Sequence, residues 1–450
     1  MCPVALHPPL AREIVPHDPA EMAARLRGER HLLFLDSAMR QEHVGRYSFL
    51  ACNPAQTLMV RGGATFLDDA PVAEAAPAVL DRLLAQGHAP PLPGLPPFQG
   101  GFAGYIAYDY GAVLEPSLSL PRRALPELML NRYDTVIAWD HLQERAWIIS
   151  RGGAAAIDAL AEKLKTRPGA PGRATLAGFA SNFTRAAYED AIARTVDHVL
   201  AGDIFQANIA QQFSAAVDAG FDAFAFHGQL RRRNAAPFAA FLDFGEVVVA
   251  SASPERLVSV RGGVAEARPI KGTRRRDANP ARDATLVAEL MASRKDRAEN
   301  VMIVDLLRND LSRVAEPGTV TVPMLCGLES YAGVHHLTSV VTARVRADVG
   351  AGSLLAALFP GGSITGAPKI RAMAVIAEME QRPRGIYCGS IGYASFSGAV
   401  DFNIAIRTVE FSDGQARFSG GGGITARSSP AEEYDETLTK VARIEKAFQP

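Results

Sequence analysis

Strand-like segments follow one another along this chain with only occasional helices between them, and this order restricts the fold more than any other feature. The segments are Arg30–Leu35, Thr57–Val60, Thr135–Trp139, Phe205–Phe213, Pro237–Leu242 and Glu246–Ala252. A doubly wound fold needs a helix between each pair of successive parallel strands. The pattern therefore predicts an α+β fold with antiparallel sheets.

Composition sets the class of protein. The chain has 450 residues, 48% hydrophobic and 21% charged, as expected of a globular protein with one very large domain or two to three ordinary ones. Its formal net charge of −1 predicts neither nucleic-acid nor membrane-surface binding. There is no signal-peptide pattern at the N-terminus and no apolar run near the ~20 residues of a membrane helix.

Cysteine usage suggests the compartment. Cys2, Cys52, Cys326 and Cys388 are widely scattered and form neither a metal-binding spacing nor a disulfide pattern. This favours a reducing environment, and we expect a cytoplasmic protein. None of the four lies in the Gly-x-Cys-x-Gly elbow of a cysteine glutaminase.

The clearest break in the chain is Thr166–Arg173, where two prolines and two glycines exclude a helix or a central strand. It separates a region 1–175 from a region 180–450. Just after the break, Thr184 can N-cap a helix in which apolar residues recur every fourth position.

Residues 253–273 predict a hairpin that carries a candidate nucleophile. Leu257–Val260 and Val264–Arg268 are strand-like, and Arg261–Gly263 forms the loop between them. If the loop has three residues, Lys271 is the diagonal neighbour of Glu255 on one face, roughly 7–8 Å away between backbones. A two-residue loop would place the two side chains on opposite faces. They form either a nucleophile–acid pair or a surface ion pair.

Two helices each present a pair of carboxylates. Asp296 and Glu299 are three residues apart in a segment with helical apolar spacing, and Glu433 and Glu436 are three apart after the capping box Ser429–Glu432. If the helices face each other, the four carboxylates offer hard oxygen ligands suited to Mg²⁺. Otherwise they are two solvated helix faces.

Two glycine-rich stretches can bind an anion through main-chain amides or form tight turns. Gly361–Gly366 resembles half of a phosphate-binding loop, but Ala367–Pro368 replaces its Lys and Ser/Thr, which argues against an ATP site. Gly420–Gly423 follows a strand and precedes a helix. Arg407, expected at the end of a strand Phe402–Ile406, can clamp a carboxylate or be a surface charge.

Together these segments resemble the chorismate-utilising enzymes. The matching stretches, in the family's order, are Gly202–Asn208, Ser253–Arg256, Pro269–Thr273, Asp296–Asp310, Phe359–Lys369, Gly389–Tyr393, Ile406–Thr408 and Gly420–Lys440, with looser matches at Arg46–Phe49 and Phe98–Asp109. The resemblance implies large antiparallel sheets packed as a sandwich with helices outside. It also implies that the regions 1–175 and 180–450 are interwoven in one compact unit.

Within the family, Pro269–Thr273 (Pro-Ile-Lys-Gly-Thr) resembles the aminodeoxychorismate synthases, in which the lysine acts covalently. Anthranilate synthases typically have alanine there, and isochorismate- and salicylate-forming relatives carry a general-base lysine where this chain has Gln206. The resemblance implies conversion of chorismate and ammonia to 4-amino-4-deoxychorismate for 4-aminobenzoate and folate biosynthesis. The alternatives are anthranilate synthase component I and a non-catalytic sensing or scaffold protein.

The resemblance also implies roles for individual residues. Lys271 would be the nucleophile and Glu255 the general acid, and Mg²⁺ would be held by Asp296, Glu299, Glu433 and Glu436. The substrate would be bound by His336, Thr365, Tyr387, Arg407, Gly421, Gly422, Gly423 and Lys440. Ammonia would come from a separate glutamine amidotransferase subunit. The segment Leu33–Ser37 lies where relatives bind tryptophan, although Asp36 departs from the feedback-inhibited pattern.

Overall fold

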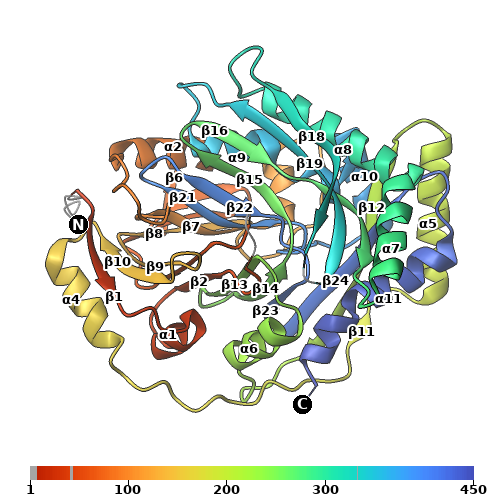
Figure 1. Cartoon of the computed structure of the whole chain (residues 1–450). Coiled ribbons are helices and arrows are strands. Elements are labelled where there is room, and N and C mark those ends of the chain that lie inside the picture. The colour runs from red at the N-terminus through yellow and green to blue at the C-terminus, as the bar shows by residue number, and fades with distance from the viewer. Residues whose placement is uncertain (1–7, 41–43, 332, 450) are drawn as a thin grey trace.

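The computed structural model describes residues 8–40, 44–331 and 333–449, in which the chain builds two large antiparallel sheets with helices outside them (Figure 1). The expected α+β sandwich is therefore confirmed. Strands from before residue 175 and after residue 180 take part in both sheets.

The first sheet has twelve strands among the described residues. In spatial order they are β1 (Leu10–Ile14), β10 (Arg145–Ser150), β9 (Thr135–Asp140), β3 (Tyr47–Ala51), β2 (Leu32–Asp36), β13 (Phe238–Asp243), β14 (Val248–Ser253), β23 (Thr408–Ser412), β24 (Gln415–Ile424), β12 (Gln206–Ala216) and β11 (Ala180–Ser181), with β20 (Gly366–Ala367) paired to β12.

The second sheet also has twelve strands in the described part of the chain. Their order is β17 (Ile270–Arg275), β19 (Val334–Arg344), β16 (Val264–Ala267), β15 (Arg256–Arg261), β22 (Val400–Asn403), β21 (Ser390–Ser395), β7 (Gly101–Ile106), β8 (Leu128–Tyr133), β4 (Gln56–Arg61), β5 (Ala64–Leu67) and β6 (Ala70–Val72), with β18 (Thr321–Ser330) paired to β19.

Helices cover the outer faces of both sheets (Figure 1). They are α1 (Pro19–Arg25), α2 (Ala76–Gln86), α3 (Gly111–Leu114), α4 (Gly153–Lys163), α5 (Arg185–Leu200), α6 (Ala223–Arg233), α7 (Pro280–Ala292), α8 (Arg294–Ser312), α9 (Ala351–Leu358), α10 (Lys369–Glu380) and α11 (Pro430–Ala447), together with the 3-10 turns η1 (Tyr108–Tyr110) and η2 (Gly362–Ile364).

Side-chain alternation along the strands explains the layers. On β10, Trp147 and Ile149 pack in the core between the sheets, whereas Ala146 and Ile148 pack in a second core beneath the outer helices. A strand buried on both faces needs apolar residues at successive positions, because neighbouring side chains point to opposite faces. The two sheets therefore share one inner core, and each has its own helix-covered outer core.

Local signals placed the starts of two helices correctly. Helix α5 begins after Thr184, whose hydroxyl accepts from the main-chain N–H of Ala187 at 3.2 Å. Helix α11 begins at Pro430, but the capping box is wrong in detail, because the Ser429 side chain makes no capping bond. Instead the Ser428 hydroxyl donates to Oε1 of Glu433 at 2.7 Å, which draws this carboxylate back to the start of its helix.

The prediction of a three-residue hairpin loop at Arg261–Gly263 is wrong. Arg261 pairs with Val264, so the loop is Gly262–Gly263, and both glycines have positive φ, +55° and +77°. Lys271 does not extend the hairpin at all: it lies on β17, which pairs with β19. Glu255 and Lys271 are therefore neighbours through the tertiary fold and not through hairpin register.

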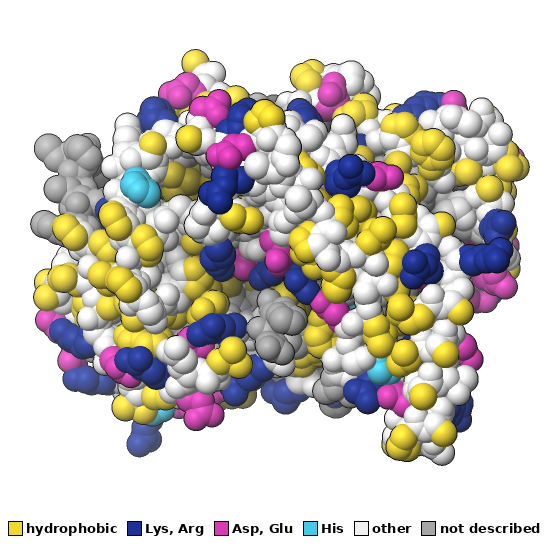
Figure 2. Space-filling view, turned by 45° about the horizontal axis from the view of Figure 1, so that its top comes forward, with side chains coloured by type: hydrophobic (Ala, Val, Ile, Leu, Met, Phe, Trp, Pro, Cys, Tyr) yellow, Lys and Arg dark blue, Asp and Glu magenta, His cyan; other side chains and the backbone are white. Residues whose placement is uncertain are grey.

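Charged side chains are dispersed over the surface. Figure 2 shows basic, acidic and apolar groups interspersed on the face it presents, around a hollow near its middle. Within the described ranges, no helix has both the length and the apolar character to span a bilayer. Cys52, Cys326 and Cys388 are free thiols, and Cys2 lies outside the described residues.

Candidate functional site

The predicted site residues come from segments far apart in the sequence. They are Lys271 on β17, Glu255 between β14 and β15, His336 on β19, Thr365 after η2, Tyr387 between α10 and β21, Arg407 between β22 and β23, Gly421, Gly422 and Gly423 on β24, Asp296 and Glu299 on α8, and Glu433, Glu436 and Lys440 on α11. Hydrogen bonds and pKa shifts, described below, link residues from both sheets with residues of α8 and α11.

Lys271 and Glu255 lie at the centre of this arrangement. Nζ of Lys271 donates to the main-chain carbonyl of Ser363 at 3.2 Å. Burial raises the pKa of Glu255, and the nearby Ser363 side chain and the charges of Lys271 and Arg407 oppose that rise. A carboxyl that keeps its proton to higher pH, beside an amine, has the character of a general acid next to a nucleophile.

Several buried polar atoms of these segments and of β12 have no hydrogen-bond partner among the described residues. They are Oε1 of Glu255, Oγ of Ser363, Oε1 of Glu299, Oδ1 of Asn208 and both amide atoms of Gln206. Each such atom costs about 1–3 kcal/mol of desolvation. Glu255, Ser363 and Glu299 each interact with Lys271, and their unpartnered atoms indicate a place suited to a polar ligand or to ordered water.

Acidic side chains of α8 and α11 come within range of each other's charge. Burial raises the pKa of Glu299; Lys271 and Lys295 oppose this, and the negative charges of Asp296 and Glu436 add to it. Glu299 and Glu436 are on different helices, so the negative charge of Glu436 reaches Glu299 across the space between α8 and α11. Asp296 also lies close to β17, the strand that carries Lys271. A Cβ added to Gly272 on that strand would lie 3.0 Å from Cγ of Asp296.

The chemical type of the four predicted ligands suits Mg²⁺. Carboxylate oxygens are its preferred protein ligands, and Oε1 of Glu299 is buried and unpartnered. The spacing is wider than that of a closed metal centre: within the described ranges, no three His, Cys, Asp or Glu side chains are grouped closely enough to hold an ion. Nζ of Lys440 instead contacts Oε1 of Glu436 at 2.6 Å and donates to the carbonyl of Gly421 at 2.8 Å.

Gly420–Gly423 is neither a turn nor a loop, because these glycines lie within β24. Their absent side chains make room for the acidic helix: a Cβ at Gly422 would lie 2.7 Å from Oε2 of Glu433. A Cβ at Gly423 would overlap Nε2 of Gln206. On one edge, Gly420–Gly423 pairs with β12. On the other edge, β23 pairs with β24 only as far as Phe418, so within the described residues the four glycines have no partner strand on that side.

Arg407 does not end a strand as expected, because β22 ends at Asn403. Its φ is +52°, in the left-handed region that costs a non-glycine residue free energy. Burial among protein atoms and the charge of Arg443 lower its pKa, whereas Glu255 raises it. The side chain nevertheless remains exposed to solvent, as expected of a cation on the wall of an open site.

The other side chains predicted to bind the substrate are His336, Thr365 and Tyr387. Nδ1 of His336 lies 2.9 Å from the Thr273 hydroxyl, and burial lowers the pKa of His336 to about 4, so the ring is neutral near pH 7. The Thr365 hydroxyl donates to the carbonyl of Gly361 at 2.9 Å, which makes Gly361–Gly366 a tight turn. Burial raises the pKa of Tyr387 far above its usual range and keeps the phenol protonated.

A cavity of about 380 Å³ lies elsewhere and is called here the second cavity. Its wall includes Asp36, Arg46, Arg256, Tyr393 and Asp401, and Lys271 does not line it. Leu35 and Ser37, from the segment singled out in the sequence, are also on its wall.

Sequence reasoning missed the supporting residues. Ser363 and Asn208 belong to stretches already singled out, but only the tertiary structure shows their atoms buried and unpartnered. Arg384, between Pro383 and Gly385, gave no signal at all, yet its guanidinium bonds three segments of the site wall. A lone arginine cannot be told from a surface charge without knowledge of its burial.

The chain is similar to known proteins of one family. The model of the family described as chorismate binding enzyme matches residues 30–446. Aminodeoxychorismate synthase component 1 of Klebsiella aerogenes is 40% identical over 422 residues, 92% of each chain. Anthranilate synthase component 1 of Geobacillus stearothermophilus is 34% identical over 466 residues, 95% of this chain and 90% of the relative. The crystal structure of anthranilate synthase component I from Streptococcus pneumoniae superposes with a TM-score of 0.80 at 30% identity, covering 90% of this chain and 94% of the other.

Proposed function

The chain belongs to the chorismate binding enzyme family, and from this premise we propose that it aminates chorismate at C4 to give 4-amino-4-deoxychorismate. The observation that carries the proposal is the amine of Lys271, which lies beside the buried acid Glu255 among unpartnered polar atoms. The similarity to aminodeoxychorismate synthase component 1 supports the same choice.

The first step forms a covalent bond to Lys271. The lone pair of Nζ attacks C2 of the ring, the ring double bonds shift, and the bond from C4 to the hydroxyl oxygen breaks. Glu255 donates its proton to this oxygen, which leaves as water. The raised pKa of Glu255 keeps that proton available. The product of the step is a protonated secondary amine between Nζ and C2, which later leaves as the neutral lysine amine.

The second step restores the enzyme. Ammonia forms a bond to C4, the double bonds shift back, and the bond between C2 and Nζ breaks. The proton released from the new amine returns the lysine and Glu255 to their starting states. Over both steps, one ammonia is consumed and one water is formed. Arg407 and main-chain amides of Gly421–Gly423 would orient the substrate's carboxylates.

Asp296, Glu299, Glu433 and Glu436 would hold Mg²⁺, which supplies positive charge to bind the substrate carboxylate and to withdraw electrons from the ring. Without a cation, these carboxylates would repel a dianionic substrate. Ammonia would come from a separate glutamine amidotransferase, because none of the four cysteines lies in a glutaminase elbow.

The deciding experiment is mass spectrometry of the product formed from chorismate, Mg²⁺ and ammonium chloride by the purified chain. We expect 4-amino-4-deoxychorismate. Glutamine should replace ammonium only when an amidotransferase is added. Turnover with glutamine and the chain alone would overturn the partner assignment.

The second candidate is anthranilate synthase component I, favoured by the 34% identity to that enzyme and by the superposition with a solved one. The same assay separates the two functions, because anthranilate is fluorescent and has lost the enolpyruvyl group. Anthranilate as the main product of the wild-type chain would replace the proposed function by this one.

A further inference from the structure

Arg384 is a buried cation that no step of the proposed reaction uses. It lies between α10 and β21 and is only 5% exposed. Nε donates to Oε2 of Glu380 at 2.9 Å and Nη2 to Oε1 at 2.6 Å, a bidentate pair with the last residue of α10. Burial disfavours the charge on Arg384, but Glu380 outweighs this and raises its pKa further. The residue is therefore a permanent guanidinium.

The remaining donors of Arg384 reach two walls of the site. Nη1 donates to the carbonyl of Ile364 at 3.2 Å, and Nη2 donates to the carbonyl of Asn208 on β12 at 2.5 Å. The N–H of Asn208 in turn donates to the carbonyl of Thr365 at 2.8 Å. Arg384, the turn at 364–365 and β12 thus close a ring of hydrogen bonds.

This ring lies directly behind the candidate nucleophile. The carbonyl that accepts from Lys271 belongs to Ser363, the residue before Ile364. Because peptide units are rigid planes joined at single atoms, fixing the Ile364 carbonyl restricts the direction of the one before it. The guanidinium carbon also lies 5.8 Å from the ring centre of Tyr387 and 4.5 Å from that of Tyr108.

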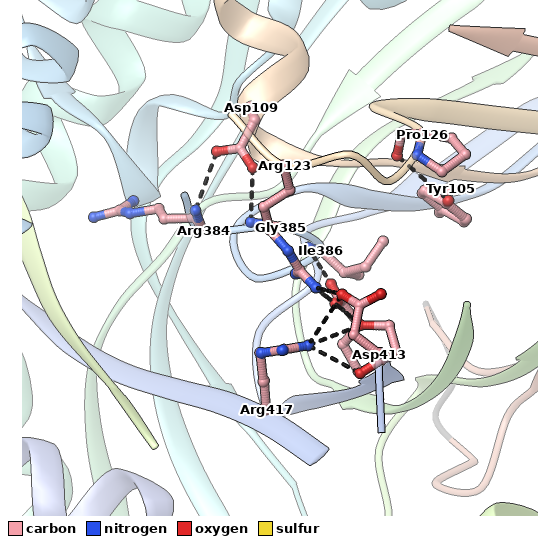
Figure 3. A network of polar contacts seen from close by, with 11 residues as sticks. Tyr105, Asp109, Arg123, Pro126, Arg384, Gly385, Ile386, Asp413 and Arg417 are labelled. Atoms are coloured by element: carbon pink, nitrogen blue, oxygen red, sulfur yellow. Dashed lines mark hydrogen bonds and ion pairs between the residues drawn. The ribbon is translucent and has the colours of Figure 1, made fainter. Parts of the chain in front are cut away.

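The main chain of Arg384 is held from the opposite side. Asp109 accepts from the N–H of Arg384 at 3.1 Å and from the N–H of Gly385 at 2.9 Å. Figure 3 shows these two bonds, with the side chain of Arg384 extending away from Asp109. Both ends of the residue are therefore fixed, so its side chain can act as a rigid brace.

We propose that Arg384 is a positioning residue that braces the 363–365 turn against β12 and α10, and thereby fixes the Lys271 amine relative to the ring it attacks. The inference rests on the proposed function, because it assigns Arg384 to the covalent step. Lysine cannot replace arginine here, since one ammonium group cannot reach Glu380, Ile364 and Asn208 in this planar arrangement.

The test uses single-turnover formation of the adduct between Lys271 and chorismate, with Mg²⁺ and without ammonia. The amplitude counts correctly folded sites, and the rate constant reports how well the amine is placed. We expect Arg384→Lys to lower the rate constant about 100-fold, as a displacement near 1 Å would, with a smaller change in chorismate affinity. Glu380→Gln keeps the arginine but weakens its anchor, and should give an intermediate rate constant.

Arg132→Lys is the matched control. Arg132 makes a bidentate pair with Asp134 at 3.0 and 2.9 Å, on β8 and away from the site, and its variant should keep the wild-type rate constant. A lowered amplitude with an unchanged rate constant in both Arg384→Lys and Glu380→Gln would overturn the inference and reduce Arg384 to a folding residue. Absence of any adduct in the wild-type chain would instead contradict the proposed function.

Discussion

The site around Lys271 and the second cavity differ in how their polar groups are paired. In the second cavity, Arg46 contacts Asp140 at 2.6 Å and Arg256 contacts Asp401 at 2.9 and 3.0 Å. Asp36 accepts from Arg231 at 2.6 Å. No side-chain nitrogen or oxygen of its described wall residues is both buried and unpartnered.

The Lys271 site has the opposite character. Oε1 of Glu255, Oε1 of Glu299 and the Ser363 hydroxyl are buried with free hydrogen-bonding capacity, and so is the Gln206 amide. A folded protein tolerates that cost where a ligand or transition state recovers it. In this comparison, the larger cavity has its polar side chains paired, whereas the proposed active site keeps buried polar atoms free for a ligand.

The largest expected effect is loss of the nucleophile. Lys271→Ala should lower formation of 4-amino-4-deoxychorismate on the order of 10⁴-fold at saturating ammonium, because no other amine can form the intermediate. The measurement is product mass spectrometry against wild type. The control is Lys165→Ala, a surface lysine whose side chain is 69% exposed. If the Lys271 variant formed 4-amino-4-deoxychorismate at the wild-type rate, Lys271 would not be the nucleophile.

Loss of the acid should have the next largest effect. Glu255→Gln should lower the rate about 10³-fold, the usual contribution of a general acid. In wild type, activity should fall as pH rises through the folded pKa of Glu255, which lies above the ordinary 4.5. The variant should lack this limb of the pH–rate profile. An unchanged profile would assign the acid to another group.

The same carboxyl predicts a change in stability. Between pH 4.5 and its higher folded pKa, Glu255 keeps its proton when folded and loses it when unfolded. Stability should therefore decrease as pH rises through that window. Urea unfolding at several pH values should show a flatter dependence for Glu255→Gln, and an identical slope in both proteins would contradict the shift.

Turnover should require Mg²⁺, and binding of the metal should depend on the carboxylates of α8 and α11. Chelation of Mg²⁺ should abolish turnover, and Glu436→Gln should weaken Mn²⁺ binding, followed by electron paramagnetic resonance, by about 100-fold. Glu432→Gln, exposed on the same helix, is the matched control. Full activity in excess chelator would leave the four carboxylates without a metal role.

The smallest effect on rate should come from the second cavity. Asp140→Asn weakens the hold on Arg46 and should lower the free energy of unfolding by about 2 kcal/mol, the contribution of hydrogen bonds to a charged group. The turnover rate measured on folded protein should not change. A large loss of kcat without loss of stability would show that the two regions are coupled.

Much of the site was visible in the sequence because its motifs are local. The spacing of Asp296 and Glu299, and of Glu433 and Glu436, places each pair on one helix face through helix geometry alone. The antiparallel architecture followed from the order of the strand-like segments. Such features depend on residues within a few positions of one another, so the chain encodes them directly.

Other features depended on packing between distant segments. The pairing of Arg261 with Val264 shortened the hairpin loop, and β17 joined β19, yet Lys271 still reached Glu255. The unpartnered Gln206 amide and the brace at Arg384 also became visible only in three dimensions. The sequence by itself determined the residue types, the antiparallel fold class and the helix faces, because these follow from neighbouring residues and short periods. The tertiary structure alone decided which side chains meet and which remain unpaired, because burial and long-range contacts are properties of the packed chain.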